Sequence, residues 1–155
     1  MVMDVFADSH SWDMKADTLK ADGDWPGLIT HCRMWLEKYP EEIGAQILLG
    51  EAYNHAGRYR ESLDLYLKVA AKRPDDYTAW YTLGSIAVKA GKTQEAIDYL
   101  SMAVYTNRDI APAIKSAYPE LYQKVKSKSG SNRILRLCVG ILILILFALA
   151  VRLFL

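Results

Sequence analysis

The side chains that most often carry enzyme chemistry are few in this chain and widely spaced. The three histidines, His10, His31 and His55, lie 21 and 24 residues apart, and the two cysteines, Cys32 and Cys138, suggest no bridge. A metal site on helices needs closely spaced ligands, such as His-x-x-x-His or Cys-x-x-Cys. Neither pattern occurs. We therefore expect no metal, and we interpret His55 as a polar helix-end residue rather than a ligand in a groove.

The acidic residues form no catalytic arrangement either. Asp13, Asp17, Glu51 and Asp64 are spread along the first half of the chain, which favours solvated helix faces over a general acid–base pair. The chain also lacks a Gly-x-Ser-x-Gly turn and a glycine-rich phosphate loop. Its formal net charge of +1 gives no broad basic surface for nucleic acid. The sequence predicts no catalytic residue, no cofactor and no nucleic-acid partner, and hence not an enzyme.

A 34-residue repeat organises the chain. When residues 43–76 are aligned with residues 77–110, Leu49-Gly50 falls on Leu83-Gly84. A period of this length is typical of a helical-repeat array, in which each unit buries its apolar face against its neighbours. Within each unit, apolar residues recur at helical spacing on both sides of a glycine. This pattern predicts two helices joined by a turn.

Glycines and prolines mark the boundaries within each unit. A glycine between two helical patterns stands where a helix end favours the left-handed backbone conformation. A small residue inside the first pattern lets the partner helix approach closely, and a proline ends the unit. The residues assigned to these roles are Gly23, Gly50, Gly57, Gly84, Gly91, Pro40 and Pro74. Gly23 and Pro40 belong to a degenerate first unit, 9–42, whose atypical positions suggest a partial cap.

At these positions the chain resembles the tetratricopeptide repeat (TPR) family, whose unit carries Trp, Leu, Gly, Tyr, Gly, Ala, an aromatic residue, Ala and Pro at fixed places. The second unit matches at Leu49, Gly50, Tyr53, Gly57, Tyr66 and Pro74. The third unit matches at Trp80, Leu83, Gly84, Gly91, Ala96, Leu100 and Ala103. Three positions depart from the pattern, since Gln46 replaces Trp, Ser62 replaces Ala and Arg108 replaces Pro.

The periodicity and the resemblance together predict an all-α fold, a TPR array of about three helical hairpins followed by a single C-terminal transmembrane helix. The TPR domain is expected over 9–128, with units 9–42, 43–76 and 77–110 and capping helices within 112–127. Its helices are expected over 10–22, 25–38, 43–56, 60–72, 77–90, 93–106, 112–117 and 119–127. Pro112 and Pro119 divide the capping segment because proline breaks a helix interior.

The resemblance also implies a partner-binding groove. In the family, the first helix of each unit lines a concave surface that holds a peptide or a helix. Carried over by position, the candidate groove residues are Asp13, Asp17, Ile47, Leu48, Glu51, Asn54, Tyr81, Thr82, Ser85 and Lys89. Ile47, Leu48 and Tyr81 would then be exposed apolar side chains that a partner covers. The alternative is that one or two of them pack sideways between helices.

A polar linker, 129–133, leads to the apolar segment 134–155. Its 22 residues would form a helix of about 33 Å, which matches a hydrocarbon core of about 30 Å. Three arginines flank the span and could reach the headgroups: Arg133, Arg136 and Arg152. A small repeat array has no interior that could surround such a helix. The segment is therefore predicted to be a tail anchor in a lipid bilayer.

Positive charge is concentrated before the span, which predicts a single-pass membrane protein whose N-terminal domain is cytoplasmic. The expected membranes are the mitochondrial outer membrane, another organelle membrane or the bacterial inner membrane. Two functions agree with this layout. One is a tail-anchored TPR adaptor or scaffold that holds a protein partner at the membrane. The other is an accessory or assembly subunit of a multi-subunit membrane complex, whose anchor packs on other spans.

Overall fold

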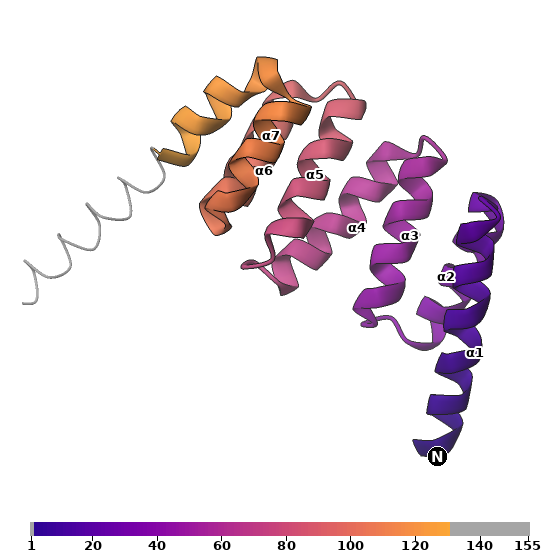
Figure 1. Ribbon diagram of the computed structural model, residues 1–155. Coiled ribbons are helices and arrows are strands. Elements are labelled where there is room, and N and C mark those ends of the chain that lie inside the picture. The colour runs from indigo at the N-terminus through magenta and orange to yellow at the C-terminus, as the bar shows by residue number, and fades with distance from the viewer. Residues whose placement is uncertain (1, 131–155) are drawn as a thin grey trace, which may run out of the picture.

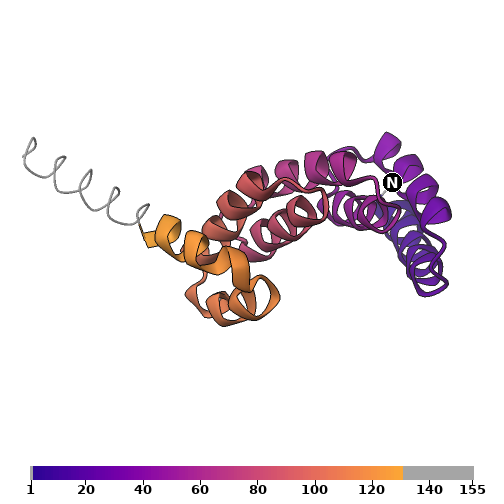
Figure 2. The same ribbon diagram turned by 90° about the horizontal axis from the view of Figure 1, so that it is seen from above.

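The computed structural model describes the backbone of residues 2–130 and the side chains of residues 11–130. These residues form antiparallel helical hairpins that stack into a curved array (Figures 1 and 2). The helices are α1 (Val2–Ala21), α2 (Trp25–Lys38), α3 (Ile43–His55), α4 (Tyr59–Lys72), α5 (Tyr77–Lys89), α6 (Thr93–Thr106) and α7 (Ala111–Ala117), with a 3-10 turn, η1 (Arg108–Ile110), before α7. Residues 119–130 are also helical. The predicted all-α repeat array is confirmed for this part of the chain.

The expected helix limits agree with the structure to within about one residue from α2 to α7, and two ends differ. Helix α1 starts at Val2 and not at residue 10, because nothing in residues 2–9 forbids a helix and neither proline nor glycine occurs there. At the other end, the helix that starts at residue 119 continues to residue 130. The first two residues of the predicted linker are therefore helical.

Local sequence signals account for the hairpin turns. Gly23, Gly57 and Gly91 have φ angles of 69°, 73° and 72°, the left-handed conformation that favours glycine at a helix end. The Asp24 carboxylate caps α2 by accepting a hydrogen bond from the Gly27 amide at 2.9 Å. The Asp76 carboxylate caps α5 by accepting one from the Thr78 amide at 2.9 Å. Each cap satisfies an amide that the first helical turn leaves unpaired.

Close packing between helices explains the two glycines inside α3 and α5. A Cβ atom at Gly50 would lie 2.8 Å from the Tyr66 ring on α4, and one at Gly84 would lie 2.6 Å from the Leu100 side chain on α6. Both sites are fully packed, since Tyr66 is 8% exposed and Leu100 is 0% exposed. The absence of a side chain is what lets the two helices of each hairpin approach.

Two of the three departures from the family pattern, Gln46 and Ser62, form side-chain hydrogen bonds within the fold. Trp80 Nε1 donates to the carbonyl of Pro74 at 2.8 Å, and Gln46 Nε2 donates to the carbonyl of Pro40 at 2.6 Å. These two bonds are equivalent, since both donors and both acceptors are 34 residues apart. Similarly, the buried Ser62 hydroxyl donates to the carbonyl of Gly50 at 2.6 Å. The Gln46 side-chain nitrogen and the Ser62 hydroxyl are thus paired inside the fold, whereas Gln46 Oε1 is buried without a partner.

The C-terminal helices cover the flank of the third unit. Ile114 and Val125 are both 0% exposed and pack with Ile97, Leu100 and Ala103 of α6. The Ser101 hydroxyl reaches the carbonyl of Val125 at 3.3 Å. In the structure these helices therefore cover apolar side chains at the end of the array.

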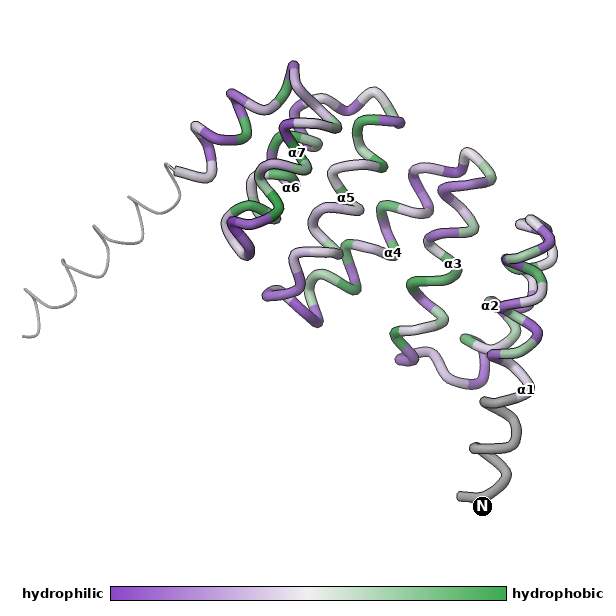
Figure 3. The backbone as a smooth tube through the Cα atoms, in the orientation of Figure 1, coloured by the Kyte–Doolittle hydropathy of each residue, from purple (hydrophilic) through white to green (hydrophobic). Residues whose placement is uncertain are grey.

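Hydropathy along the backbone is mixed in every described helix (Figure 3). Across the described residues, no helix combines the length and apolar character that a membrane crossing needs. The predicted span 134–155 and its flanking Arg133, Arg136 and Arg152 lie outside the described residues.

Candidate partner-binding surface

The first helices of the three hairpins, α1, α3 and α5, are linked side by side by polar contacts. Lys20 Nζ on α1 lies 2.7 Å from Glu51 Oε2 on α3. Lys89 Nζ on α5 donates to Asn54 Oδ1 on α3 at 3.2 Å. Because these pairs bridge successive units, the ten candidate groove residues lie on three neighbouring helices. We call this set of residues on α1, α3 and α5 the first-helix surface.

The ten residues differ in exposure. Asp13, Asp17 and Lys89 are exposed, whereas the other seven, Ile47, Leu48, Glu51, Asn54, Tyr81, Thr82 and Ser85, are half-buried. The three apolar members were expected either to be exposed or, for one or two of them, to pack sideways between helices. Instead, Leu48 packs against the cluster of α1–α3, Ile47 against the cluster of α4–α6, and Tyr81 against that of α6 and the capping helices. Each therefore contributes to the core and presents only part of its surface to a partner.

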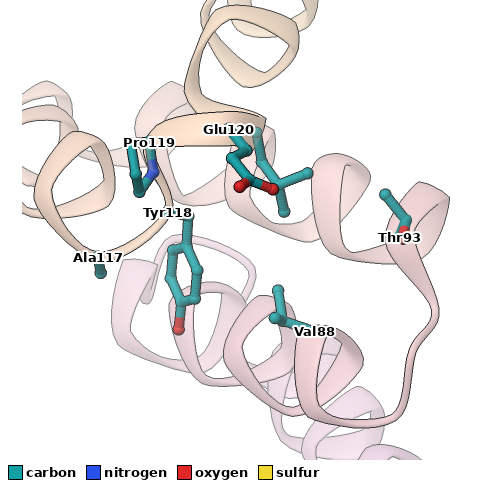
Figure 4. Close-up of a pocket in the computed structure, with 7 residues that line it drawn as sticks. Val88, Thr93, Ala117, Tyr118, Pro119 and Glu120 are labelled. Carbon is teal, nitrogen blue, oxygen red and sulfur yellow. The ribbon is translucent and has the colours of Figure 1, made fainter.

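The capping segment borders the first-helix surface at one end. The rings of Tyr81 and Tyr118 are tilted against each other with centroids 6.4 Å apart. Burial and the neighbouring Tyr118 hydroxyl raise the pKa of Tyr81 above its usual value. Beside this pair, Tyr118, Val88, Thr93 and Glu120 line a pocket of about 380 Å³ together with Ala117, Pro119 and Leu121 (Figure 4). Tyr118 was not among the predicted site residues, because it belongs to the cap and not to a repeat position.

A second pocket of about 380 Å³ lies where α1, α2 and α3 meet, and we call it the α1–α3 pocket. Its lining consists of Trp12, Asp13, Trp35, Glu42, Gly44, Ile47 and Leu48. Three of these residues, Asp13, Ile47 and Leu48, are candidate groove residues. The structure thus brings them together with two tryptophans that the sequence analysis did not place in a site. The sequence feature that could have identified this site is Trp35, a bulky residue where the next two units have Val69 and Ala103.

The two tryptophans form the centre of an aromatic stack. Trp12 stacks on Trp35 at 5.1 Å and on His31 at 5.6 Å between ring centroids. His31 Nε2 also contacts the carbonyl oxygen of Trp12 at 3.1 Å. The indole Nε1 atoms of both Trp12 and Trp35 are buried without a hydrogen-bond partner. Trp12 lacks the bond that Trp80 makes, because α1 continues as a helix where the later units have a proline loop.

Only some carboxylates of this region are free to meet a partner. Glu51 is paired with Lys20, and Glu42 caps α3 by accepting from the amides of Gly44 and Ala45. Asp13 and Asp17, by contrast, are exposed and have no ion pair with any described residue. Among the described side chains of α1 and α3, the carboxylates without an ion pair or a capping role are therefore Asp13 and Asp17, one helical turn apart on α1.

The candidate chemistry can be checked against the same residues. Within 11–130, no group of three His, Cys, Asp or Glu side chains is placed to hold a metal ion. His55 stacks on Trp25 at 4.0 Å between ring centroids, so it occupies a helix end and packs on an aromatic ring. Cys32 is 0% exposed, and burial raises the pKa of its thiol to about 12. His55 and Cys32 thus both have packing roles in the described part of the fold.

Comparison with solved structures supports the fold. A crystal structure of the protein MamA is 22% identical, covers 79% of this chain and 71% of its own, and superimposes with a TM-score of 0.63. A second MamA crystal structure is 23% identical, covers 75% of this chain and 72% of its own, and has a TM-score of 0.60. At this level of identity the likeness concerns the fold alone. A comparison with curated protein sequences found no match.

The sequence itself matches a family model over its repeat region. The tetratricopeptide repeat model matches residues 35–76 and, in a second placement, residues 47–113. Together the two placements cover just over half of the 155 residues. The matched region contains the turn glycines Gly57 and Gly91 and the close-packed Gly50 and Gly84, whose structural roles are described above. The chain belongs to the tetratricopeptide repeat family.

Proposed function

We propose that this protein is a non-enzymatic, membrane-anchored adaptor that binds a protein partner on the first-helix surface and holds it at a membrane. The observation that carries the proposal is the alignment of α1, α3 and α5 through the Lys20–Glu51 and Asn54–Lys89 contacts. These contacts join residues of successive units into one continuous surface. Pockets of about 380 Å³ lie beside it at both ends. A surface of this kind suits a peptide or a helix better than a small substrate.

Membrane attachment is part of the proposal and rests on sequence. The segment 134–155 is apolar apart from Arg136 and Arg152, and its length suits a bilayer. The excess of Lys and Arg before it favours a cytoplasmic N-terminal domain. The mitochondrial outer membrane, another organelle membrane and the bacterial inner membrane all agree with this orientation. The anchor, composed mainly of Leu, Ile, Val, Phe and Ala, would interact chiefly with lipid.

The test measures the contribution of the first-helix surface to partner binding separately from that of the anchor. Tyr81→Ala combined with Leu48→Ala should abolish partner capture while the protein stays folded and in the membrane fraction. Leu67→Ala is the matched control, because Leu67 is a 39% exposed apolar residue on α4, outside the first-helix surface. Circular dichroism of all variants checks that the fold is retained. Alanine replaces Leu48, since a charge at this half-buried site would itself destabilise the fold.

In a second arm, residues 137–151 are replaced with an unrelated apolar span of equal length. Partner capture should survive, because many apolar sequences can serve as a bilayer anchor. The opposite pattern, with capture lost on the anchor swap and kept in the surface variant, would refute the adaptor. It would instead indicate a subunit that joins a membrane complex through its span.

A further inference from the structure

The α1–α3 pocket is lined by side chains that differ from those at the corresponding place one unit later. Gly44 and Ile47 line this pocket, and 34 residues further on the chain has Thr78 and Tyr81. Together with the other lining residues, Gly44 and Ile47 enclose a space where α1, α2 and α3 meet. The resulting volume of about 380 Å³ lies within the roughly 300–1,000 Å³ of typical ligand pockets. The pocket is therefore large enough to receive a bulky side chain.

The lining of the pocket indicates what that side chain is. Trp12, Trp35, Ile47 and Leu48 supply apolar surface. The Trp12 side chain is 8% exposed, and the indole N–H groups of Trp12 and Trp35 have no acceptor. Buried donors are nearly always paired, so two unpaired indoles at one pocket are unusual. Because both nitrogens are closed to solvent, a partner side chain in this pocket would contact the carbon atoms of the Trp12 and Trp35 rings, which favours a large apolar side chain.

The charge beside the pocket is negative and unpaired. Asp13 lines the pocket, and Asp17 lies one turn further along α1. Neither has an ion pair with a described residue, whereas Glu51 and Glu42 are already engaged by Lys20 and by the start of α3. Lys20, three residues after Asp17 on α1, is paired with Glu51. A basic side chain of a partner would meet two carboxylates without displacing an internal ion pair.

From these observations we infer that the α1–α3 pocket is the specificity site for a partner segment that carries a bulky apolar residue beside a Lys or Arg. The apolar residue enters the pocket between Trp12, Trp35 and Leu48, and the basic residue pairs with Asp13 and Asp17. This inference rests on the proposed function, because it assigns the partner's chemistry at one end of the first-helix surface. The other end of the first-helix surface, at Tyr81 and Tyr118, then adds contact area with the partner but does not discriminate between partners by their charge.

The experiment selects peptides from a display library of random 16-residue sequences on the full-length protein in mild detergent. Peptides that bind the first-helix surface are recognised by their loss of binding to Tyr81→Ala/Leu48→Ala. The inference expects these peptides to be enriched in Lys or Arg next to a large apolar residue. Asp13→Asn/Asp17→Asn should lower the affinity of these peptides by about threefold to tenfold. Raised salt should likewise lower their affinity for the wild-type protein. The control Asp64→Asn/Asp75→Asn removes the same charge from exposed sites outside the surface and should leave the affinity unchanged.

The pocket itself is tested by fluorescence. In a Trp25→Phe/Trp80→Phe background, the remaining emission comes from Trp12 and Trp35, and a selected peptide should change it. The inference is overturned if the peptides whose binding depends on Tyr81 and Leu48 carry no basic residue, or if Asp13→Asn/Asp17→Asn leaves their affinity unchanged. Either result would be compatible with the proposed adaptor function. An absence of any peptide that depends on Tyr81 and Leu48 overturns the proposed function as well.

Discussion

The contact between Gly84 and Leu100 allows the packing of the third hairpin to be tested quantitatively. A Cβ atom at Gly84 would lie 2.6 Å from both Leu100 Cγ and Cδ2, and the Leu100 side chain is 0% exposed and cannot swing into solvent. Overpacking of this kind costs about 1–3 kcal/mol. Alanine in place of glycine inside a helix gains about 1 kcal/mol. Gly84→Ala should therefore destabilise the fold by about 0–2 kcal/mol, and the larger Gly84→Leu by more.

The clash is identified by a double-mutant cycle. Leu100→Ala alone should cost about 2–5 kcal/mol, because it leaves a cavity in the core. The cavity gives the new methyl group at position 84 room, so Gly84→Ala/Leu100→Ala should be less destabilised than the sum of the two changes by about 1–3 kcal/mol. Urea unfolding followed by circular dichroism measures all three variants. Leu28→Ala is the control, because Leu28 is a buried residue of the first hairpin, far from Gly84 in the chain. Its change in the free energy of unfolding should add to that of Gly84→Ala.

Additivity of Gly84→Ala and Leu100→Ala within about 0.5 kcal/mol would refute the close approach of α5 and α6 at this point. A stabilising effect of Gly84→Leu would refute it as well, because a leucine cannot be placed in contact with Leu100 without moving one of the helices.

Two further predictions concern the folded domain. A fragment of residues 1–130 should fold alone as a soluble, helical domain with a cooperative thermal melt, because Val125 and Ser129 of the last helix are still buried against the array; strand-rich circular dichroism or the absence of a cooperative melt would contradict this. Stability should fall as pH rises from about 9 to about 12, because burial first and the nearby carboxylates second raise the pKa of Cys32 and of Tyr66 to about 12. In both cases the group loses its proton at a lower pH in the unfolded chain than in the folded one, so the free energy of unfolding is greatest below the unfolded pKa and falls as the pH approaches the folded pKa. Tyr66→Phe should make the free energy of unfolding depend less on pH in this range. An unchanged pH dependence in both Tyr66→Phe and Cys32→Ala would contradict the assignment.

The repeat architecture was predictable because its signals are local. Gly57 and Gly91 follow helix ends that need a left-handed residue, and Asp24 stands directly before a helix start, so each can be recognised from its neighbours along the chain. The start of α1 was not predictable in the same way. Residues 2–9 lack a clear start signal, and the repeat alignment placed the first helix by analogy with units that are preceded by a proline loop.

The candidate site depended on contacts between units, which local patterns do not reveal. The position of Glu51 in the repeat placed it on the first-helix surface, but only the folded array pairs it with Lys20, 31 residues away. The same holds for Tyr118, which meets Tyr81 from the cap, and for Ile47, whose side chain packs into the core. Each of these side chains is long enough to reach several neighbours. Which neighbour it contacts is fixed only when one hairpin stacks on the next.

The sequence alone thus determined the period, the turns and the helix-facing positions, because these follow from backbone conformation and apolar spacing within a single unit. The tertiary structure decided which carboxylates are free, how far Ile47, Leu48 and Tyr81 are buried, and where a pocket opens between α1 and α3. The physical reason is that side-chain pairing and packing volume depend on residues 30 or more positions apart, whose distances are set only when the hairpins stack.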